Sequence, residues 1–355
     1  MSLKMIHIGL GIMGLEWCKK AIPPNVKDGL IEVVAAVDIN PSRLKYAQKY
    51  LGLSSSYCYT DLKKALEENK ADFCSVVVTP ENHEKVINLS IDYDLHILSE
   101  KPIADTLDAS KRIVNKVLKS DKKMAITMTH RYDQDKTTLI NELSSGKYGK
   151  IDYLICNVTA DTRKLGSWGD FRHKMKNPLM IEGAVHHFDL LSTIAGSPCN
   201  TLYAQTWNPS WGDYNGDSQG LAILKFKNGT RAFYEGASCN AVGLKAWEKE
   251  YIRVECEKGT LVLSGRKLEC FNYNNKKVRV ESMEGQGKII PLIKQSKWGN
   301  AWLIEQFYDW VVNGVTMETK VDENIQSVAM VTAAIKSSQT GQQVFVQDLL
   351  EIENK

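Results

Sequence analysis

The stretch MIHIGLGIMG, Met5 to Gly14, runs from a short apolar segment through a glycine-rich turn into a helix-like segment. Its glycines, Gly9, Gly11 and Gly14, have the GxGxxG spacing. In a strand-to-helix turn the first glycine makes the tight bend, the second lets the backbone approach a pyrophosphate, and the third lets the helix pack on the strand. The stretch therefore predicts the first turn of a dinucleotide-binding domain.

Strand-like and helix-like segments alternate through the first third of the chain. The strand-like runs are short, rich in β-branched residues and bounded by turn or cap residues: 5–10, 31–38, 72–79, 95–100 and 123–128. Helix-like patterns separate them, at 12–22, 41–50, 61–68, 82–94 and 105–119. Because apolar strands separated by helices imply a parallel sheet covered on both faces, we predict an α/β, doubly wound domain.

An aspartate ends the second predicted strand. Asp38 follows Gly14 at the distance where an acidic residue binds a ribose diol and repels a 2′-phosphate, which favours NAD over NADP. Arg43 lies near enough in the sequence to keep NADP as an alternative. A second alternative is a glycine turn used only for packing, with Asp38 as the cap of the next helix.

A lysine stands at a later strand end, in LSEKPIADT, Leu98 to Thr106. Ligands of a doubly wound sheet bind outside the carboxyl ends of its strands. Pro102 stops the strand and keeps Lys101 out of helical geometry. An ammonium at this place can hold a substrate oxygen and stabilise negative charge that develops on it. The alternative is a solvated loop lysine.

A polar stripe runs along the otherwise apolar stretch MIEGAVHHFDLLSTIAG, Met180 to Gly196. Glu182, His186 and Asp189 fall at i, i+4 and i+7, so a helix places them on one face. The stretch contains no Lys or Arg. A row of acidic and histidine side chains without neighbouring cations is typical of a cavity. The alternative is a polar face that meets water or a partner chain. His186 and His187 point to different faces and cannot easily share an ion, and the pair of Glu182 with His186 lacks a third ligand, so no metal site is predicted.

These motifs together resemble those of the glucose-fructose oxidoreductase and inositol dehydrogenase (Gfo/Idh/MocA) family. They occur in family order over nearly the whole chain: GLGIMG, Asp38, TPENH (79–83), SEKP (99–102), HRY (130–132), EGAVHHFDLL (182–191) and SSQTGQQV (337–344). The resemblance implies a Rossmann domain followed by an α/β domain with a large, mostly antiparallel open-faced sheet. It also implies a pyridine nucleotide that oxidises a sugar, cyclitol or other secondary alcohol. Its catalytic group would be Lys101 with the histidine and acid of the 182–189 motif.

In the implied chemistry, His186 takes the hydroxyl proton as general base while hydride leaves for the cofactor. Lys101 orients the hydroxyl oxygen, and Glu182 or Asp189 holds the imidazole. The commonest family pattern has Asp and Gly where this chain has Glu182 and Ala184, so the role of the longer acid stays open. Two other functions also stay open: a glycosidase-type enzyme that oxidises its sugar transiently, and a non-catalytic NAD-bound sensor.

The remaining site predictions follow from position. The predicted cofactor-binding residues lie at the glycine turn and at strand ends: Gly9, Gly11, Ile12, Met13, Gly14, Asp38, Ile39, Arg43, Thr79, Pro80, His83, Glu100, Lys101 and Pro102. The candidate substrate residues are His130, Arg131, Trp168 and Arg172. The loop 207–217 is interpreted either as a surface that stacks on a sugar or as a turn-rich hairpin end. His7 and His96 are predicted to be structural.

The patterning changes near residues 128–132. This change predicts a Rossmann domain of residues 2–128 and a substrate and oligomerisation domain of residues 129–355. Strand-like runs dominate after Lys150, at 151–161, 221–229, 231–239, 251–263 and 267–274. Helix-like patterns at 300–312 and 322–338 are expected to pack back toward the junction. A broad sheet with one bare face predicts a homodimer or homotetramer built sheet to sheet.

The composition excludes several classes of protein. With 45 Lys+Arg against 42 Asp+Glu and no basic block, the 355-residue chain lacks the footprint of a nucleic-acid binder. No apolar run reaches the length of a membrane span, and no signal-peptide pattern precedes the first strand. The eight cysteines are scattered without CxxC spacing, which indicates the reduced thiols of a cytoplasmic protein. The predicted partner is a small-molecule sugar or polyol.

Overall fold

The computed structural model describes residues 2–273 and 282–351, which divide into two compact units. Unit 1 comprises Met1–Thr129 and Ser296–Val328, and unit 2 comprises His130–Gln295 and Ala329–Lys355. The segment 296–328 thus belongs with the N-terminal residues, although it follows the strands of unit 2 in the sequence. Among the helices of the described residues, none combines the length and apolar character needed to cross a bilayer.

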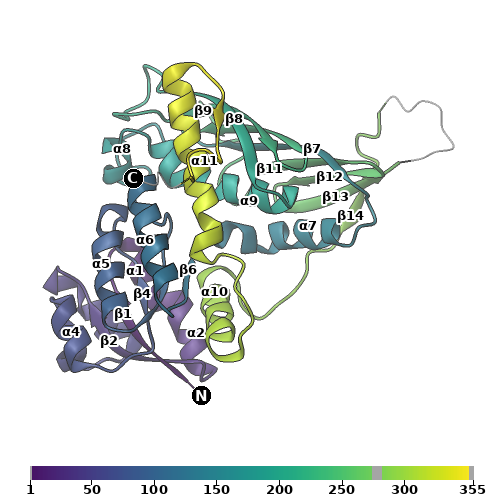
Figure 1. Cartoon of the computed structure of the whole chain (residues 1–355). Coiled ribbons are helices and arrows are strands. Elements are labelled where there is room, and N and C mark those ends of the chain that lie inside the picture. The colour runs from purple at the N-terminus through teal and green to yellow at the C-terminus, as the bar shows by residue number, and fades with distance from the viewer. Residues whose placement is uncertain (1, 274–281, 352–355) are drawn as a thin grey trace. The chain divides into compact units, whose positions relative to one another are not determined.

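Unit 1 contains a six-stranded sheet in the order β3-β2-β1-β4-β5-β6, and its strand pairs are parallel. The strands are β1 (Leu3–Ile8), β2 (Ile31–Val37), β3 (Cys58–Tyr59), β4 (Phe73–Val76), β5 (His96–Ser99) and β6 (Met124–Ile126). Helices lie on both faces of this sheet (Figure 1). The predicted doubly wound α/β domain is therefore confirmed. The sequence analysis missed β3, which is only two residues long.

The α-helices of unit 1 follow the predicted positions. They are α1 (Ile12–Glu16), α2 (Ile22–Lys27), α3 (Lys45–Leu51), α4 (Leu62–Glu68), α5 (Pro80–Asp92), α6 (Leu107–Lys119) and α10 (Gly299–Tyr308). A π-helical turn, Trp17–Ala21, joins α1 to α2. The Asn25 side chain donates to the carbonyl of Ala301 at 2.9 Å, and its oxygen lies 3.0 Å from Lys297 Nζ. These contacts attach the returning segment to the N-terminal residues.

A buried histidine links the first strand to the glycine turn. His7 Nδ1 lies 2.7 Å from the Ser75 hydroxyl on β4, and Nε2 lies 3.4 Å from the carbonyl of Gly14. Its ring stacks on Trp17 with centroids 6.0 Å apart. Burial lowers the pKa of His7 to about 4, because the charged imidazolium loses its hydration there. His7 is thus a neutral member of the core.

We expect acid to destabilise the fold through His7. Its pKa is lower when folded than when unfolded, so the unfolded state binds more protons between about pH 6.5 and pH 4. The free energy of unfolding should therefore fall by about 1.4 kcal/mol per pH unit across that window, and a His7→Gln variant should lack this part of the slope. Urea unfolding at half-unit pH intervals measures both slopes. Equal slopes in the two proteins would contradict the assignment.

Unit 2 contains a nine-stranded sheet in the order β14-β13-β12-β11-β7-β10-β9-β8-β15. Its strands are β7 (Ile151–Thr159), β8 (Cys199–Trp207), β9 (Gln219–Phe226), β10 (Arg231–Ala237), β11 (Tyr251–Cys256), β12 (Gly259–Ser264), β13 (Lys267–Asn272), β14 (Lys288–Ile290) and β15 (Val344–Phe345). Strands β7 and β10 pair in parallel and the other neighbours pair antiparallel, which confirms the mostly antiparallel sheet. The sequence analysis missed β8, β14 and β15. The end of its predicted run 267–274 lies outside the described residues.

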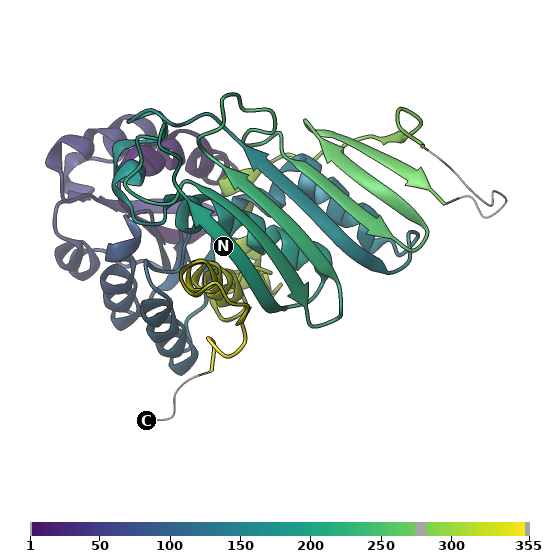
Figure 2. The same cartoon turned by 90° about the horizontal axis from the view of Figure 1, so that it is seen from above.

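The helices of unit 2 gather on one face of this sheet. They are α7 (Gln134–Ser144), α8 (Asp170–Lys174) and α9 (Val185–Ala195), and the long helix α11 (Val321–Thr340) enters the unit from residue 329 onward. Figure 2 shows α7 and α9 behind the sheet and the opposite face without a covering helix in the described part of the chain. A π-helical turn, Leu179–Ala184, precedes α9. In the polar motif, residues 182–184 therefore lie in the π-helical turn and residues 185–189 lie in α9.

Candidate active site

The glycine turn of unit 1 leaves no room for side chains where the backbone must bend. Gly9 has φ +96°, and a Cβ added to it would lie 2.2 Å from the carbonyl oxygen of Val77. A Cβ on Gly14 would lie 2.0 Å from the carbonyl oxygen of Gly9. At Gly11 a Cβ would approach only Arg43, at 3.8 Å, so this backbone faces open space. The turn thus has the shape that a pyrophosphate at a helix N-terminus requires.

Asp38 is held at the carboxyl end of β2 by backbone amides. Its Oδ2 accepts the Leu10 N–H at 2.7 Å, and its Oδ1 accepts the Asn40 N–H at 2.8 Å. Asn40, not Asp38, caps the following turn through its bond from the Ser42 N–H. Arg43 Nη1 lies 3.8 Å from Oδ2. The carboxylate is therefore fixed at the edge of the sheet where a ribose would bind.

Exposed apolar side chains flank the same edge. Ile12, at the start of α1, is 80% exposed, and Ile39, just after β2, is 89% exposed. Met13 is also exposed. Apolar surface beside a pyrophosphate turn and a ribose-binding carboxylate can pack against an adenine ring. The residues of unit 1 therefore fit a dinucleotide.

The next two strand ends are joined by a buried histidine. His83 Nδ1 lies 2.9 Å from the carbonyl oxygen of Pro102, and Nε2 lies 3.1 Å from that of Val78. Burial lowers the pKa of His83, and the three neighbouring carbonyls only partly oppose it. Thr79 is the residue that precedes the first turn of α5, which begins with Pro80. The structure thus gives His83 a positioning role: it holds the loop after Lys101 against the end of β4.

Lys101 lies two residues after the end of β5 and is half-buried. The peptide bond between Lys101 and Pro102 is cis. The neighbouring Glu100 carboxylate accepts the Trp17 indole N–H at 2.9 Å and the Asn300 amide at 3.2 Å. Glu100, predicted as a cofactor contact, is thus held by residues of the interior of unit 1.

The polar stripe of unit 2, which comprises Glu182, His186 and Asp189, is buried, and arginines bind its two acids. His186, on α9, is 5% exposed. Arg172 Nε donates to Glu182 Oε2 at 2.9 Å. Arg131 grips Asp189 with two bonds, Nε to Oδ2 at 2.7 Å and Nη2 to Oδ1 at 2.6 Å. Both acids that were predicted to orient His186 therefore have an arginine counter-ion.

These ion pairs give a structural role to residues predicted as substrate contacts. Arg172 lies over the ring of Trp168 at 5.0 Å and over that of Phe171 at 4.5 Å, so its guanidinium is stacked as well as paired. The partners lie 10 and 58 residues apart in the sequence. No periodicity could have paired them. His130, the other candidate, is buried next to α9.

Trp247 is a site residue that the sequence analysis missed. Its ring centroid lies 5.3 Å from that of His186, 5.4 Å from that of His187 and 4.6 Å from that of His130. Trp247 is nevertheless 43% exposed. It therefore forms an aromatic wall beside His186 with one side open to a ligand. Its only signal in the sequence was an aromatic residue in a loop between two strand-like runs.

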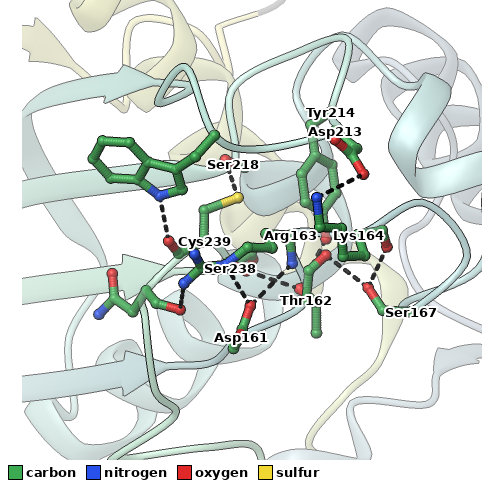
Figure 3. Close-up of polar contacts among 12 residues, drawn as sticks. Asp161, Thr162, Arg163, Lys164, Ser167, Asp213, Tyr214, Ser218, Ser238 and Cys239 are labelled. Atoms are coloured by element: carbon green, nitrogen blue, oxygen red, sulfur yellow. Dashed lines mark hydrogen bonds and ion pairs between the residues drawn. The ribbon is translucent and has the colours of Figure 1, made fainter.

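A hydrogen-bonded cluster joins residues 161–167, which precede the motif, to loops that follow it, as Figure 3 shows. Within it the hydroxyls of Thr162 and Tyr214 lie 2.8 Å apart, and Arg163 Nε donates to Asp161 Oδ1 at 2.8 Å. Trp211 Nε1 donates to the carbonyl oxygen of Cys239 at 2.9 Å. The loop 207–217 is thus attached to the strands of unit 2. Its indole rings at 207 and 211 remain exposed, which keeps both interpretations of the loop open.

Two family models match the chain. The oxidoreductase family NAD-binding Rossmann fold matches residues 3–128, and the oxidoreductase family C-terminal alpha/beta domain matches residues 140–346. A relative from Sinorhizobium fredii, called uncharacterized protein y4oX, is 46% identical over 351 residues, which cover 99% of this chain and 98% of the relative. An inositol 2-dehydrogenase/D-chiro-inositol 3-dehydrogenase from Lacticaseibacillus casei is 35% identical over 150 residues, 42% of each chain.

Solved structures share the fold over the whole chain. An oxidoreductase from Agrobacterium radiobacter, in complex with NAD+, L-tartaric acid and magnesium, has a TM-score of 0.84 at 18% identity and covers 98% of this chain and 100% of its own. The WlbA dehydrogenase from Bordetella pertussis, in complex with NADH and UDP-GlcNAcA, has a TM-score of 0.78 at 19% identity, with 97% and 99% covered. At these identities the likeness concerns the fold alone.

Proposed function

Because the chain belongs to the Gfo/Idh/MocA oxidoreductase family and contains its NAD-binding Rossmann domain, we propose that it transfers hydride between a secondary alcohol and NAD. The alcohol would be that of a sugar, cyclitol or sugar derivative. The observation that carries the proposal is Lys101, which follows β5 at the ligand-binding edge of the sheet that contains the glycine turn. The predicted membership of this family is confirmed by both family models.

The proposed chemistry assigns separate tasks to the two units. NAD supplies the hydride acceptor when it is bound. Gly9, Gly11 and Gly14 make the pyrophosphate turn, and Lys101 holds the alcohol oxygen and stabilises its developing charge. His186 takes the hydroxyl proton. Both acids of the polar stripe are paired with arginines, so the imidazole is the proposed proton acceptor.

The test is absorbance at the reduced-nicotinamide band across a panel of sugars, cyclitols and sugar acids, with NAD and with NADP. Net reduction with one substrate class supports the proposal. If NAD binds tightly and no substrate gives net reduction, the next assay is glycoside cleavage, which a transient oxidation would produce. Absence of both activities with retained NAD binding would leave the NAD-bound sensor as the function.

Asp38 is expected to set the preference for NAD. An Asp38→Asn variant keeps an oxygen for the Leu10 N–H but loses the charge that repels a 2′-phosphate. The ratio of NADP affinity to NAD affinity should therefore rise about tenfold, which corresponds to about 1.4 kcal/mol. Fluorescence titration with both nucleotides measures it. The matched control is Asp92→Asn, at an exposed carboxylate, and an unchanged ratio in Asp38→Asn would contradict the role.

We also propose that a second copy of this chain covers the open sheet face. Ile223 on β9 and Phe233 on β10 are cross-strand neighbours and are exposed by 60% and 37%. Arg231 and Glu235 lie on the same face, two residues before and after Phe233. A two-fold axis near Phe233 would set each arginine beside the other copy's glutamate, and such self-complementarity is what an isologous interface requires.

An Ile223→Glu variant is expected to convert the predicted homodimer or homotetramer to smaller species. The substitution adds a charge to the centre of an apolar contact, and desolvating that charge opposes association. Light scattering after gel filtration gives the mass of each species. Lys227→Glu is the control, because Lys227 lies in the turn after β9. A wild-type monomer, or an unchanged mass in Ile223→Glu, would refute the sheet-to-sheet assembly.

A reducing compartment is the proposed location, which for this chain means the cytoplasm. All eight cysteines lie in the described part of the chain, where no disulfide joins any of them, and six of them are buried. Burial raises the pKa of the Cys18 and Cys74 thiols to about 12, so these groups stay protonated and unreactive. Such thiols serve as small apolar core residues. Export of a fluorescent fusion from the native cell would argue against the location.

A further inference from the structure

Three ligand-type side chains meet in the interior of unit 2, outside the proposed hydride-transfer chemistry. His130 lies before α7, His187 lies on α9, and Glu250 directly precedes β11. All three are buried, and one potential ligand atom from each lies within 4.8 Å of the other two. Three separate segments of the fold therefore bring two imidazoles and one carboxylate to a common point.

The Nδ1 atom of each imidazole already has a polar neighbour. His130 Nδ1 lies 3.3 Å from the Asp133 carboxylate, and His187 Nδ1 lies 3.2 Å from the hydroxyl of Tyr234. His187 Nε2 is buried and has no hydrogen-bond partner among residues 2–273 and 282–351. Metal-ligating histidines have this arrangement, because a carboxylate or other polar group on one ring nitrogen orients the other nitrogen toward the ion.

The distance between the His130 nitrogen and the Glu250 oxygen also fits two ligands of one metal ion. Nε2 lies 3.2 Å from Oε1, yet within the described part of the chain Nε2 makes no contact with hydrogen-bond geometry. Two donors on one tetrahedral zinc ion, each about 2.1 Å from it, lie about 3.4 Å apart. Oε1 also accepts the Glu248 N–H at 2.8 Å, which fixes the carboxylate. The lone pairs of both groups can therefore share a cation.

The charges around the cluster favour a cation. Lys136 Nζ lies 2.8 Å from Glu250 Oε2 and 3.5 Å from carboxylate oxygens of Asp133 and Asp135. These are three carboxylates against one ammonium. A divalent cation at the cluster would offset this excess of negative charge, and uncompensated buried charge is costly.

We propose that His130, His187 and Glu250 bind one divalent transition-metal ion of the zinc class. Two imidazoles and a carboxylate are borderline ligands that select zinc and its neighbours over magnesium or calcium. Glu250 would bind through Oε1 while Lys136 holds Oε2. The ion would tie the segment that carries Trp247 to α9, and so fix the aromatic wall beside His186. Its binding does not depend on the hydride-transfer function.

The test uses the full-length chain without an affinity tag. After removal of adventitious metal with a chelator, the protein is titrated with Co²⁺, whose visible absorption reports nitrogen and oxygen coordination, and with Zn²⁺ by calorimetry. The expected result is one ion per chain for both metals and a melting temperature that rises as the site fills, because a ligand that binds only the folded state stabilises it. Metal content after purification should approach one equivalent.

Two variants locate the site. Glu250→Gln and His187→Gln should each weaken Zn²⁺ binding at least a hundredfold, while His96→Gln, which removes a histidine of unit 1, should leave it unchanged. Binding of fewer than 0.1 equivalents by the wild type, with no cobalt spectrum, would overturn the proposal and identify the cluster as a buried ion pair of His130 with Glu250. That measurement needs no variant, so a misfolded Glu250→Gln protein would not rescue the idea. Equal affinity in all three variants would overturn it as well.

Discussion

Replacing His186 by alanine is expected to lower kcat by about 10²- to 10⁴-fold, the usual contribution of a general base. The imidazole is the proposed base of the buried stripe, because both carboxylates are paired with Arg172 and Arg131. The variant should still bind NAD with wild-type affinity, because the glycine turn lies in unit 1 and His186 lies in unit 2. Steady-state rates with the substrate found in the panel, together with NAD titration, measure both quantities.

Controls separate this effect from loss of structure. His96→Ala removes another histidine, from the start of β5, and should keep kcat within about twofold. His186→Gln keeps size and polarity but cannot accept a proton at neutral pH, so it should be as inactive as the alanine variant. A His186→Gln enzyme with wild-type kcat would show that another group takes the proton.

Replacing Lys101 by methionine is expected to lower kcat by about 10²- to 10³-fold, the range found for removal of one preorganised donor to a developing oxyanion. Methionine keeps much of the length and apolar stem of lysine and removes the charge. Because the interaction strengthens as the alkoxide forms, kcat should fall more than the substrate KM rises. Lys101 also lies beside the nucleotide edge, so NAD affinity is measured separately and should change by less than about threefold.

The Lys101→Met experiment has a matched control and a clear contrary outcome. Lys119→Met removes an exposed lysine at the end of α6 in the same unit and should leave kcat unchanged. If Lys101→Met raised KM alone with kcat unchanged, Lys101 would bind substrate equally in the ground and transition states. The proposed oxyanion role would then be wrong, although a binding role would survive.

Local pattern was sufficient to predict most of unit 1. The glycine turn works through bends and close approaches within ten residues, and β-branched runs alternate with helical periods on either side of it. The missed strands β3 and β15 are two residues long and exist only because a neighbouring strand supplies hydrogen bonds. Strand β8 was missed although it is nine residues long, so brevity does not explain that error.

The candidate site was predictable only in part. Lys101 was recognised because a proline follows it at a strand end. His186 was recognised because it lies in a polar helical stripe that contains no Lys or Arg. Trp247 did not, since a lone aromatic residue in a loop has no period. The two arginines and the two acids were recognised as candidate site residues, but their pairing was not.

The sequence by itself determined the fold class, the family and the nucleotide-binding edge, because those depend on spacings within single turns and strands. Tertiary structure alone decided the pairs Arg131 with Asp189 and Arg172 with Glu182, and the meeting of His130, His187 and Glu250. The physical reason is that Coulomb attraction and metal ligation act over a few ångströms of space. Residues far apart in the chain reach that distance only after the sheet and helices have packed.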